Sequence, residues 1–341
     1  MNQPSHIVVI GTSAGGFNAL YSLVSHLNPD TNAAYLIVLH LSYRSIGGYL
    51  AYSLQKHTSL KCILAMDDIP LRRGYVYVAV PNHHLLVNKD NVKLGNGPVE
   101  NRWRPSIDVL FRSAAAHFTT RVIGIVLTGL LNDGTNGMSA IKRSGGTTIV
   151  QDPNEAEYPD MPLSVLNSME VDHVLSVAEM GAVIDKIVAE AKPGDRIADA
   201  DLLAEAEMYE KMHTSIKASE PWGSHTSYTC PDCGGVLFKH AQDAVTKFKC
   251  HTGHSFTLRD LVLKQSEELE TSLWFAVRSL EQKKDLLESL ATRADQIGNK
   301  ILVDSYRKRI DEFESHINNL KKVLVSNLDD LEDNDNLMAN V

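Results

Sequence analysis

Residues 6–16 read His-Ile-Val-Val-Ile-Gly-Thr-Ser-Ala-Gly-Gly and decide the fold. Ile7 to Ile10 is a short apolar run rich in β-branched residues, which predicts a buried strand. Residues 11–15 match G-x-S-x-G, in which glycines let a strand turn sharply into a helix and leave the serine hydroxyl at the turn. The pattern predicts Ser13 as a nucleophile, and a glycine-rich turn with an incidental serine is the alternative.

The bulk composition sets the class of protein. A chain of 341 residues predicts two or three domains, and a net charge of −9 argues against a general nucleic-acid binder. The N-terminus has no basic segment followed by an apolar one, and no apolar run approaches 18 residues, so we expect a cytoplasmic protein without membrane insertion. We expect no organic cofactor.

Two further strands carry the other polar residues of a candidate site. Residues 34–39 form a second apolar run that ends at His40, and the strand–helix–strand spacing predicts parallel neighbours. Residues 121–129 form the strongest strand pattern and lead to Asp133. Open α/β sheets place their sites at the carboxyl ends of the strands, so Ser13, His40 and Asp133 are expected to meet there. A capping or turn-forming role for Asp133 is the alternative.

The remaining pattern of the first 195 residues alternates strands and helices. Residues 74–81 and 85–94 are expected to form a β-hairpin, with His83 and His84 in its solvated turn. A helix is predicted to open at residues 102–108, with a proline early and an aspartate in its first turn. The sequence therefore predicts an α/β fold with a doubly wound, mostly parallel sheet.

A Ser/His/Asp trio fits nucleophilic hydrolysis. The histidine takes the serine proton and returns it to the leaving group, while the aspartate fixes the tautomer of the imidazole. The chain order Ser, His, Asp differs from the Ser, Asp, His order of α/β-hydrolases and disfavours that fold. Backbone N–H groups of Ala14 and of the loop with Leu130 and Leu131 are the candidate oxyanion donors.

Several motifs together resemble the catalytic domain of the CheB family of chemotaxis protein-glutamate methylesterases. They are Ile10-Gly-Thr-Ser-Ala-Gly-Gly16, His40, Arg104-Pro-Ser-Ile-Asp108, Leu127-Thr-Gly-Leu-Leu-Asn-Asp-Gly134, Gln151-Asp152 and Met161-Pro162. The resemblance implies that Ser13 is the nucleophile, His40 the base and Asp133 the orienting acid, with Arg104 near the substrate. It also implies hydrolysis of γ-glutamyl methyl esters on methylated chemoreceptors, and some family members also deamidate receptor glutamines.

Two departures from the family pattern limit what carries over. Better-known members have an N-terminal receiver domain, whereas here the nucleophile strand starts at residue 6, so we expect no such regulator in this chain. The usual Met-Gly pair before the aspartate is Leu130-Leu131, which affects the oxyanion loop. The alternative function is a binding or signalling scaffold on the same fold. A nucleotide-phosphate cradle lacks both the G-x-G-x-x-G spacing and a Walker lysine.

A cysteine cluster predicts a metal site in the second half of the chain. Cys230-x2-Cys233 and Cys250 with a following histidine supply the four ligands of a structural, tetrahedral zinc site in a zinc-ribbon-like domain. His254 is the preferred fourth ligand and His251 the alternative, and zinc is favoured over iron for this mixed set.

The last stretch predicts an antiparallel helical hairpin. Apolar residues keep a heptad rhythm on both sides of a reversal at Gly298-Asn299. An outer face of this hairpin is a candidate for homo-oligomer or receptor contact. The expected domains are the catalytic domain at 1–195, a helical linker at 196–227, the zinc-ribbon-like domain at 228–258, the hairpin at 259–333 and an acidic tail at 334–341.

Overall fold

The computed structural model describes residues 3–40, 47–190, 198–199, 202–203, 206, 223–240 and 245–338. The helix predicted in the linker falls outside these residues apart from the isolated positions between 198 and 206. The chain divides into two compact units, Met1–Leu258 and Arg259–Val341. The domain boundaries expected within the first unit stay predictions.

A seven-stranded parallel sheet forms the centre of the first unit. Its order is β10-β9-β8-β1-β2-β5-β3, and each adjacent pair is parallel. Its strands are β1 (His6–Thr12), β2 (Ala33–Leu39), β3 (Lys61–Leu64), β5 (Tyr75–Val78), β8 (Val122–Val126), β9 (Thr147–Gln151) and β10 (His173–Leu175). Every residue of β1 and β2 is buried, as continuous apolar runs require in a sheet covered on both faces.

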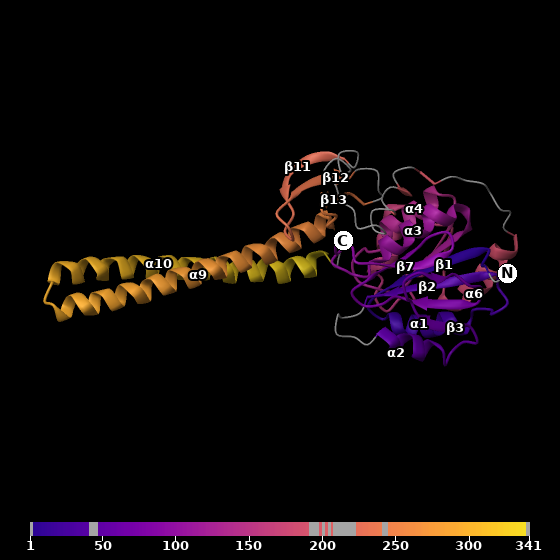
Figure 1. Ribbon diagram of the computed structural model, residues 1–341, viewed down its shortest axis with the longest axis horizontal. Helices are drawn as coiled ribbons and strands as arrows, with labels where there is room; N and C mark the ends of the chain where they lie inside the picture. Colours follow the sequence, from indigo (N-terminus) through magenta and orange to yellow (C-terminus); the bar gives the residue numbers. More distant parts are fainter. Residues whose placement is uncertain are drawn as a thin grey trace. The chain divides into compact units, whose positions relative to one another are not determined.

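Helices cover both faces of this sheet, which confirms the predicted doubly wound α/β fold (Figure 1). One layer contains α1 (Gly16–Ser25), α2 (Gly47–Leu54) and α6 (Val177–Glu190), and the other contains α3 (Ile107–Phe118), α4 (Thr135–Arg143) and α5 (Asp160–Ser168). A short 3₁₀ helix at Thr119–Arg121 follows α3. Successive side chains of a strand point to opposite faces, so Ile7 and Val9 pack into one layer while Val8 and Ile10 pack into the other.

The predicted β-hairpin at 74–94 is wrong in its first strand. β5 lies inside the parallel sheet because its Val76, Tyr77 and Val78 are buried on both faces. The antiparallel pair consists instead of β6 (His84–Val87) and β7 (Asn91–Gly95), with β4 (Ile69–Pro70) at its edge. His84, expected in a solvated turn, starts β6 and has 0% of its surface exposed.

A second, smaller sheet carries the cysteine cluster. It is antiparallel, in the order β11 (Ser224–Thr229), β12 (Val236–His240), β13 (Lys247–Cys250) and β14 (Ser255–Thr257). We call residues 224–257 the ribbon. Its first strand begins within residues 196–227, which were expected to form a helical linker.

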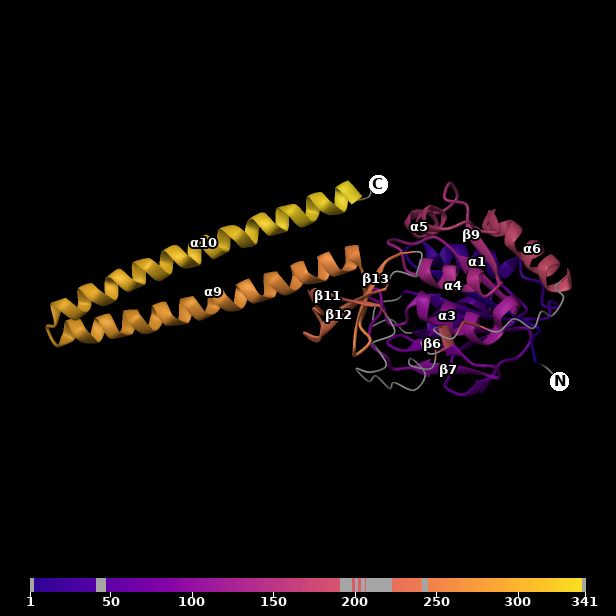
Figure 2. The ribbon, with the colours of Figure 1, turned by 90° about the horizontal axis from the view of Figure 1, so that it is seen from above.

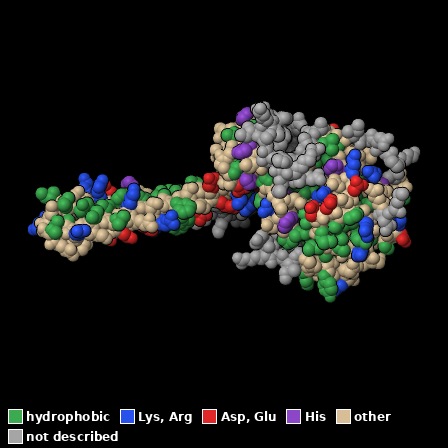
Figure 3. Space-filling view, viewed as in Figure 1, with side chains coloured by type: hydrophobic (Ala, Val, Ile, Leu, Met, Phe, Trp, Pro, Cys, Tyr) green, Lys and Arg blue, Asp and Glu red, His purple; other side chains and the backbone are tan. Residues whose placement is uncertain are grey.

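The second unit is a pair of long helices, α9 (Leu258–Gln296) and α10 (Lys300–Met338), which lie side by side in Figures 1 and 2. Gly298 at the reversal has a positive φ of 73°, which glycine adopts without steric cost. Val277, Ile317 and Leu324 form the buried seam between the helices. Apolar and charged side chains both appear on the hairpin face shown in Figure 3. Among the helices described, none has the length and hydropathy required to span a membrane.

Candidate active site

Three neighbouring strands bring Ser13, His40 and Asp133 together at one edge of the sheet. β1 lies between β2 and β8, and each of the three residues follows the carboxyl end of one of these strands. Nδ1 of His40 is 3.3 Å from Oγ of Ser13, and its Nε2 is 2.9 Å from Oδ2 of Asp133. His40 and Asp133 are buried, while Ser13 is partly exposed. The structure therefore places the predicted serine, base and acid in one continuous line.

Asp133 is held by the start of α3. The backbone N–H groups of Ile107 and Asp108 donate to its carboxylate at 2.7 and 3.1 Å, and the Asn101 amide donates at 2.9 Å. Burial alone would raise the pKa of Asp133, but the hydrogen bond from His40, together with those from Asn101 and Ile107, outweighs burial and holds that pKa below its ordinary value. Asp133 is thus kept ionised and oriented towards His40.

The ionised aspartate fixes which nitrogen of His40 carries the proton. A carboxylate only accepts hydrogen bonds, so Nε2 of His40 is the donor and Nδ1 is left with a lone pair facing Ser13. The ring is further held by Trp103, which stacks on it with centroids 4.3 Å apart and planes 8° apart. His40 is therefore ready to accept a proton from the serine hydroxyl.

The loop after β8 packs against the turn that carries Ser13. The Ser13 N–H and the Thr12 hydroxyl both donate to the carbonyl of Thr128, at 3.0 and 2.7 Å. Leu131 has a φ of 68°, in the left-handed region that a leucine rarely adopts, and Leu130 is 46% exposed. The Thr128 hydroxyl also donates to the carbonyl of Ala14 at 3.0 Å, which places the start of this loop beside Ala14. The role of Ala14, Leu130 and Leu131 as oxyanion donors stays a prediction.

Arg104 is held by hydrogen bonds to Asn82 and Gly97. Its guanidinium donates to Oδ1 of Asn82 at 2.6 and 3.0 Å and to the carbonyl of Gly97 at 2.9 Å. The side chain is only partly buried. The bonds fix the direction of the guanidinium, and its predicted place near the substrate stays a prediction.

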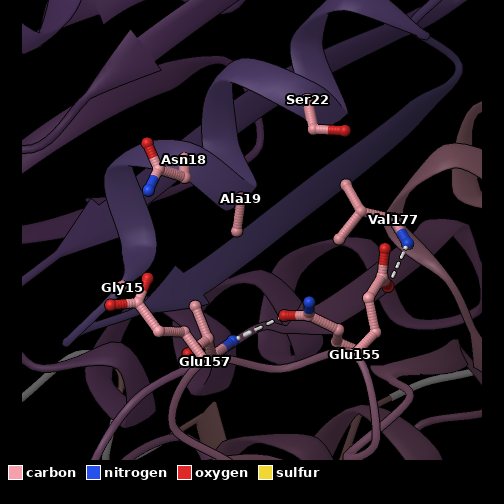
Figure 4. Close-up of a pocket in the computed structure, with 9 residues that line it drawn as sticks. Gly15, Asn18, Ala19, Ser22, Glu155, Glu157 and Val177 are labelled. Carbon is pink, nitrogen blue, oxygen red and sulfur yellow. Dashed lines mark hydrogen bonds between the residues drawn. The ribbon is translucent and has the colours of Figure 1, made fainter.

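A polar pocket of about 200 Å³ opens beside the turn that carries Ser13 (Figure 4). Asn18 and Ser22 of α1 line one side, and Glu155 and Glu157 of the loop after β9 line another. Glu155 accepts a hydrogen bond of 2.8 Å from the N–H of Val177, at the start of α6. The pocket reaches the turn itself through Gly15.

The predicted metal ligands meet in the ribbon. One ligand atom from each of Cys230, Cys233, Cys250 and His254 lies within 4.8 Å of the other three. Two turns present them: the N–H of Cys230 bonds the carbonyl of Gly235 at 2.7 Å, and that of Cys250 bonds the carbonyl of His254 at 3.0 Å. His254 is the histidine in this cluster, its role as the fourth ligand stays a prediction, and three sulfurs and one imidazole are a donor set that could hold a metal ion.

The electrostatics of the cluster also fit a cation. The hydrogen bond from Cys230 is the main cause that lowers the pKa of the Cys250 thiol, against the opposing effect of burial. His254 and Thr252 add hydrogen bonds in the same direction. The cluster thus favours a thiolate, which is the form of cysteine that binds metals.

Sequence reasoning missed three residues around the line of Ser13, His40 and Asp133. Asn101 and Trp103 lie just before the Arg104–Asp108 motif. His84 contacts the same motif, because its Nδ1 accepts a hydrogen bond from the Ser106 N–H at 3.2 Å. Proximity to the motif was the one signal available for Asn101 and Trp103. For His84 the apolar run that follows it, Leu85–Val87, indicated a buried strand rather than a solvated turn.

Comparison with known proteins gives the same fold over the α/β part of the first unit. The family profile described as CheB methylesterase matches residues 8–184. A relative from Leptospira interrogans is 38% identical over 181 residues, which cover 53% of this chain and 93% of the relative. The "Protein-glutamate methylesterase/protein-glutamine glutaminase" of Symbiobacterium thermophilum is 32% identical over 188 residues, covering 55% and 52% of the two chains. The crystal structure of the Thermotoga maritima CheB methylesterase catalytic domain superposes with a TM-score of 0.52 at 29% identity, over 53% of this chain and 98% of that one.

Proposed function

Because the chain belongs to the CheB methylesterase family, we propose that it is a serine hydrolase that removes methyl esters from glutamyl side chains of chemoreceptors. The observation that carries the proposal is the line from Ser13 through His40 to Asp133, with contacts of 3.3 and 2.9 Å. Such a line activates a serine hydroxyl that is otherwise a weak nucleophile. The products are glutamate and methanol.

The first half of the reaction forms an acyl-enzyme. Oγ of Ser13 attacks the ester carbonyl while Nδ1 of His40 takes the hydroxyl proton, and Asp133 stabilises the imidazolium that results. The tetrahedral oxyanion receives hydrogen bonds from the N–H of Ala14 and from the loop N–H of Leu130 or Leu131. One donor of this kind is worth roughly 2.7–4 kcal/mol of transition-state stabilisation.

His40 returns its proton to the methoxide as methanol leaves, which completes the acyl-enzyme. In the second half His40 takes a proton from the water that attacks the acyl carbonyl, and returns that proton to Oγ of Ser13 as the acyl–oxygen bond breaks and the glutamate side chain departs. The same steps with a glutamine side chain release ammonia, so the site also suits deamidation, the second activity in the name of the Symbiobacterium relative. Arg104, whose guanidinium is fixed by Asn82, is the candidate contact to the receptor segment that carries the ester.

The ribbon holds structural zinc in this proposal. Cys230, Cys233, Cys250 and His254 would fill all four positions of a tetrahedral Zn²⁺, so the ion supplies folding energy to the ribbon and no open position for chemistry. Zinc suits a set of mixed sulfur and nitrogen ligands better than the harder divalent cations do.

Release of methanol from membranes that carry methylated chemoreceptors tests the function. Ser13→Ala is expected to abolish release while the melting temperature stays unchanged, because the side chain is small and partly exposed. Ser25→Ala, at an exposed serine of α1, is the matched control and is expected to keep full activity. Methanol release by Ser13→Ala at the wild-type rate would contradict the proposal. A wild-type protein that neither releases methanol nor reacts with a serine-directed phosphonate would favour the scaffold alternative.

A further inference from the structure

Lys247 of the ribbon contacts Asp108, one of the residues that hold Asp133. Nζ of Lys247, on β13, is 2.6 Å from Oε1 of Glu100 and 3.1 Å from Oδ2 of Asp108. The Lys247 side chain is only 4% exposed, and Glu100 and Asp108 are 0% and 1% exposed. A second contact lies beside it, where the N–H of Asn101 bonds the carbonyl of Ser255 at 3.2 Å. The ribbon is thus docked on the α/β part of its unit through buried charges.

Two hydrogen bonds connect the contact between Lys247 and Asp108 to the line of Ser13, His40 and Asp133. The Asn101 side-chain amide donates to Oδ2 of Asp108 and to Oδ1 of Asp133, each at 2.9 Å. Oδ2 of Asp108 is also the oxygen that Lys247 contacts. Lys247 is therefore separated from Asp133 only by Asp108 and Asn101, and Asp133 bonds His40 directly.

The charges of the cluster explain why a lysine is needed there. Glu100, Asp108 and Asp133 bring three buried carboxyl groups together. Arg112 is 2.6 Å from Glu100 but 3.9 Å from Asp108, so Lys247 is the nearer cation to Asp108. A buried carboxylate without a close counter-charge is costly and either takes up a proton or moves. Burial raises the pKa of Asp108, and the charge of Lys247 is the largest influence that opposes this.

We propose that Lys247 is a positioning residue for hydrolysis: it fixes Asp108, and through Asn101 it fixes Asp133 against His40. This inference rests on the proposed function. The matched family profile ends at residue 184, so the proposal assigns a part in catalysis to a segment outside the family domain. It makes the ribbon a part of the active site's support rather than an independent attachment.

The test compares Lys247→Met with Lys239→Met in the full chain. Lys239 is an exposed lysine on β12 of the same ribbon and is the matched control. We expect Lys247→Met to slow phosphonate labelling of Ser13, and kcat on a p-nitrophenyl ester, by on the order of 10²-fold with KM unchanged, as misplaced catalytic groups do. Lys247→Arg restores the cation and is expected to recover most of both rates, which a loss of packing alone would not predict. Wild-type rates in Lys247→Met would overturn the proposal.

A second measurement keeps the inference separate from the proposed function. Hydrogen exchange at the backbone amides of Ile107 and Asp108, which donate to Asp133, reports the Asp133 contacts whether or not any ester is cleaved. Exchange is expected to be faster in Lys247→Met than in wild type or Lys239→Met, and equal exchange in all three would overturn the proposal. If the wild-type protein cleaves no ester but its exchange is still slower than that of Lys247→Met, the proposed function is wrong and the inference about Lys247 stands.

If Lys247→Met does not fold, the double variant Lys247→Met/Asp108→Asn removes the buried charge together with its partner. It is expected to fold, since no uncompensated carboxylate remains at Asp108, and to keep the slow labelling because Asn101 loses an anionic acceptor. Labelling of the double variant at the wild-type rate would also overturn the proposal.

Discussion

Nε2 of His40 lies 2.9 Å from Oδ2 of Asp133, while Nδ1 of the same ring faces Ser13. In the serine-protease arrangement the two nitrogens have the opposite roles. The reversal leaves the chemistry intact, because either ring nitrogen can accept a proton while the other donates to a carboxylate. Asp133 must then select the tautomer with its proton on Nε2. It does so while buried and held by five further donors, one each from Asn101, Ser106, Ile107, Asp108 and Gly134.

Replacement of that carboxylate is expected to disable the site without unfolding it. Asp133→Asn presents an amide that no longer selects the correct tautomer of His40, and a loss of about 10⁴-fold in kcat is typical of this change. Ester hydrolysis at pH 7, together with thermal melting, measures the effect. Asp30→Asn, at an exposed aspartate of the same unit, is the control. An Asp133→Asn variant within tenfold of wild type would show that Asp133 only caps α3.

Leu131 adopts a conformation that glycine would take more easily. Its φ of 68° places a leucine side chain in the left-handed region, at a cost of roughly 1–2 kcal/mol. Leu131→Gly is expected to relieve this strain and, after the greater freedom of glycine in the unfolded chain is subtracted, to raise the free energy of unfolding by about 0.5–1 kcal/mol. Denaturant unfolding measures the change. Leu130→Gly, at the neighbouring position outside the left-handed region, should lower stability instead, and equal effects of both changes would refute the strain.

His84 is expected to make the fold sensitive to mild acid. Burial lowers the pKa of His84 to about 4, so between pH 6.5 and 4 the unfolded chain binds a proton that the folded chain does not. The contribution of neutral His84 to the free energy of unfolding is fully present above pH 6.5. It is lost as the pH falls towards 4, and the loss reaches up to about 3 kcal/mol. Melting temperatures from pH 7 to 4 should fall less steeply for His84→Gln than for wild type. His83→Gln, at the partly exposed neighbour, is the control, and a His84→Gln profile parallel to wild type would contradict the prediction.

Zinc content tests the ribbon directly. Elemental analysis is expected to find about one zinc per wild-type chain and a large loss in Cys233→Ser, because three ligands hold the ion far more weakly than four. Cys62→Ser changes a cysteine outside the cluster and should keep the metal. His254→Ala is expected to lose zinc, whereas His251→Ala is expected to retain it. The opposite result for the two histidines would reassign the fourth ligand.

Chelation is expected to act on the active site as well as on the ribbon, because Lys247 and Cys250 are the two ends of β13. Removal of zinc should therefore increase hydrogen exchange at Ile107 and Asp108, and readdition should reverse it.

Local sequence patterns determined the sheet, its helices and the three residues at its edge. The runs at 7–10, 34–39 and 121–129 are apolar enough to be buried on both faces. Polar residues that follow the ends of such strands, directly or in the next loop, are expected at the same edge of a parallel sheet. The cluster of three cysteines and His254 was also predictable, because two turns close in sequence present all four side chains. The same local reasoning misplaced residues 74–78 and His84, because the apolar pattern of a strand does not specify which distant strands it pairs with.

Only the tertiary structure decided how Asp133 is held and by what. Its donors come from the start of α3, and the charge behind them comes from Lys247, 114 positions further along the chain than Asp133. In the sequence Lys247 is one of 33 basic residues, with nothing to distinguish it from a solvated one. Its significance arises from burial, since a counter-charge matters most where water is excluded, and burial is a property of the assembled fold.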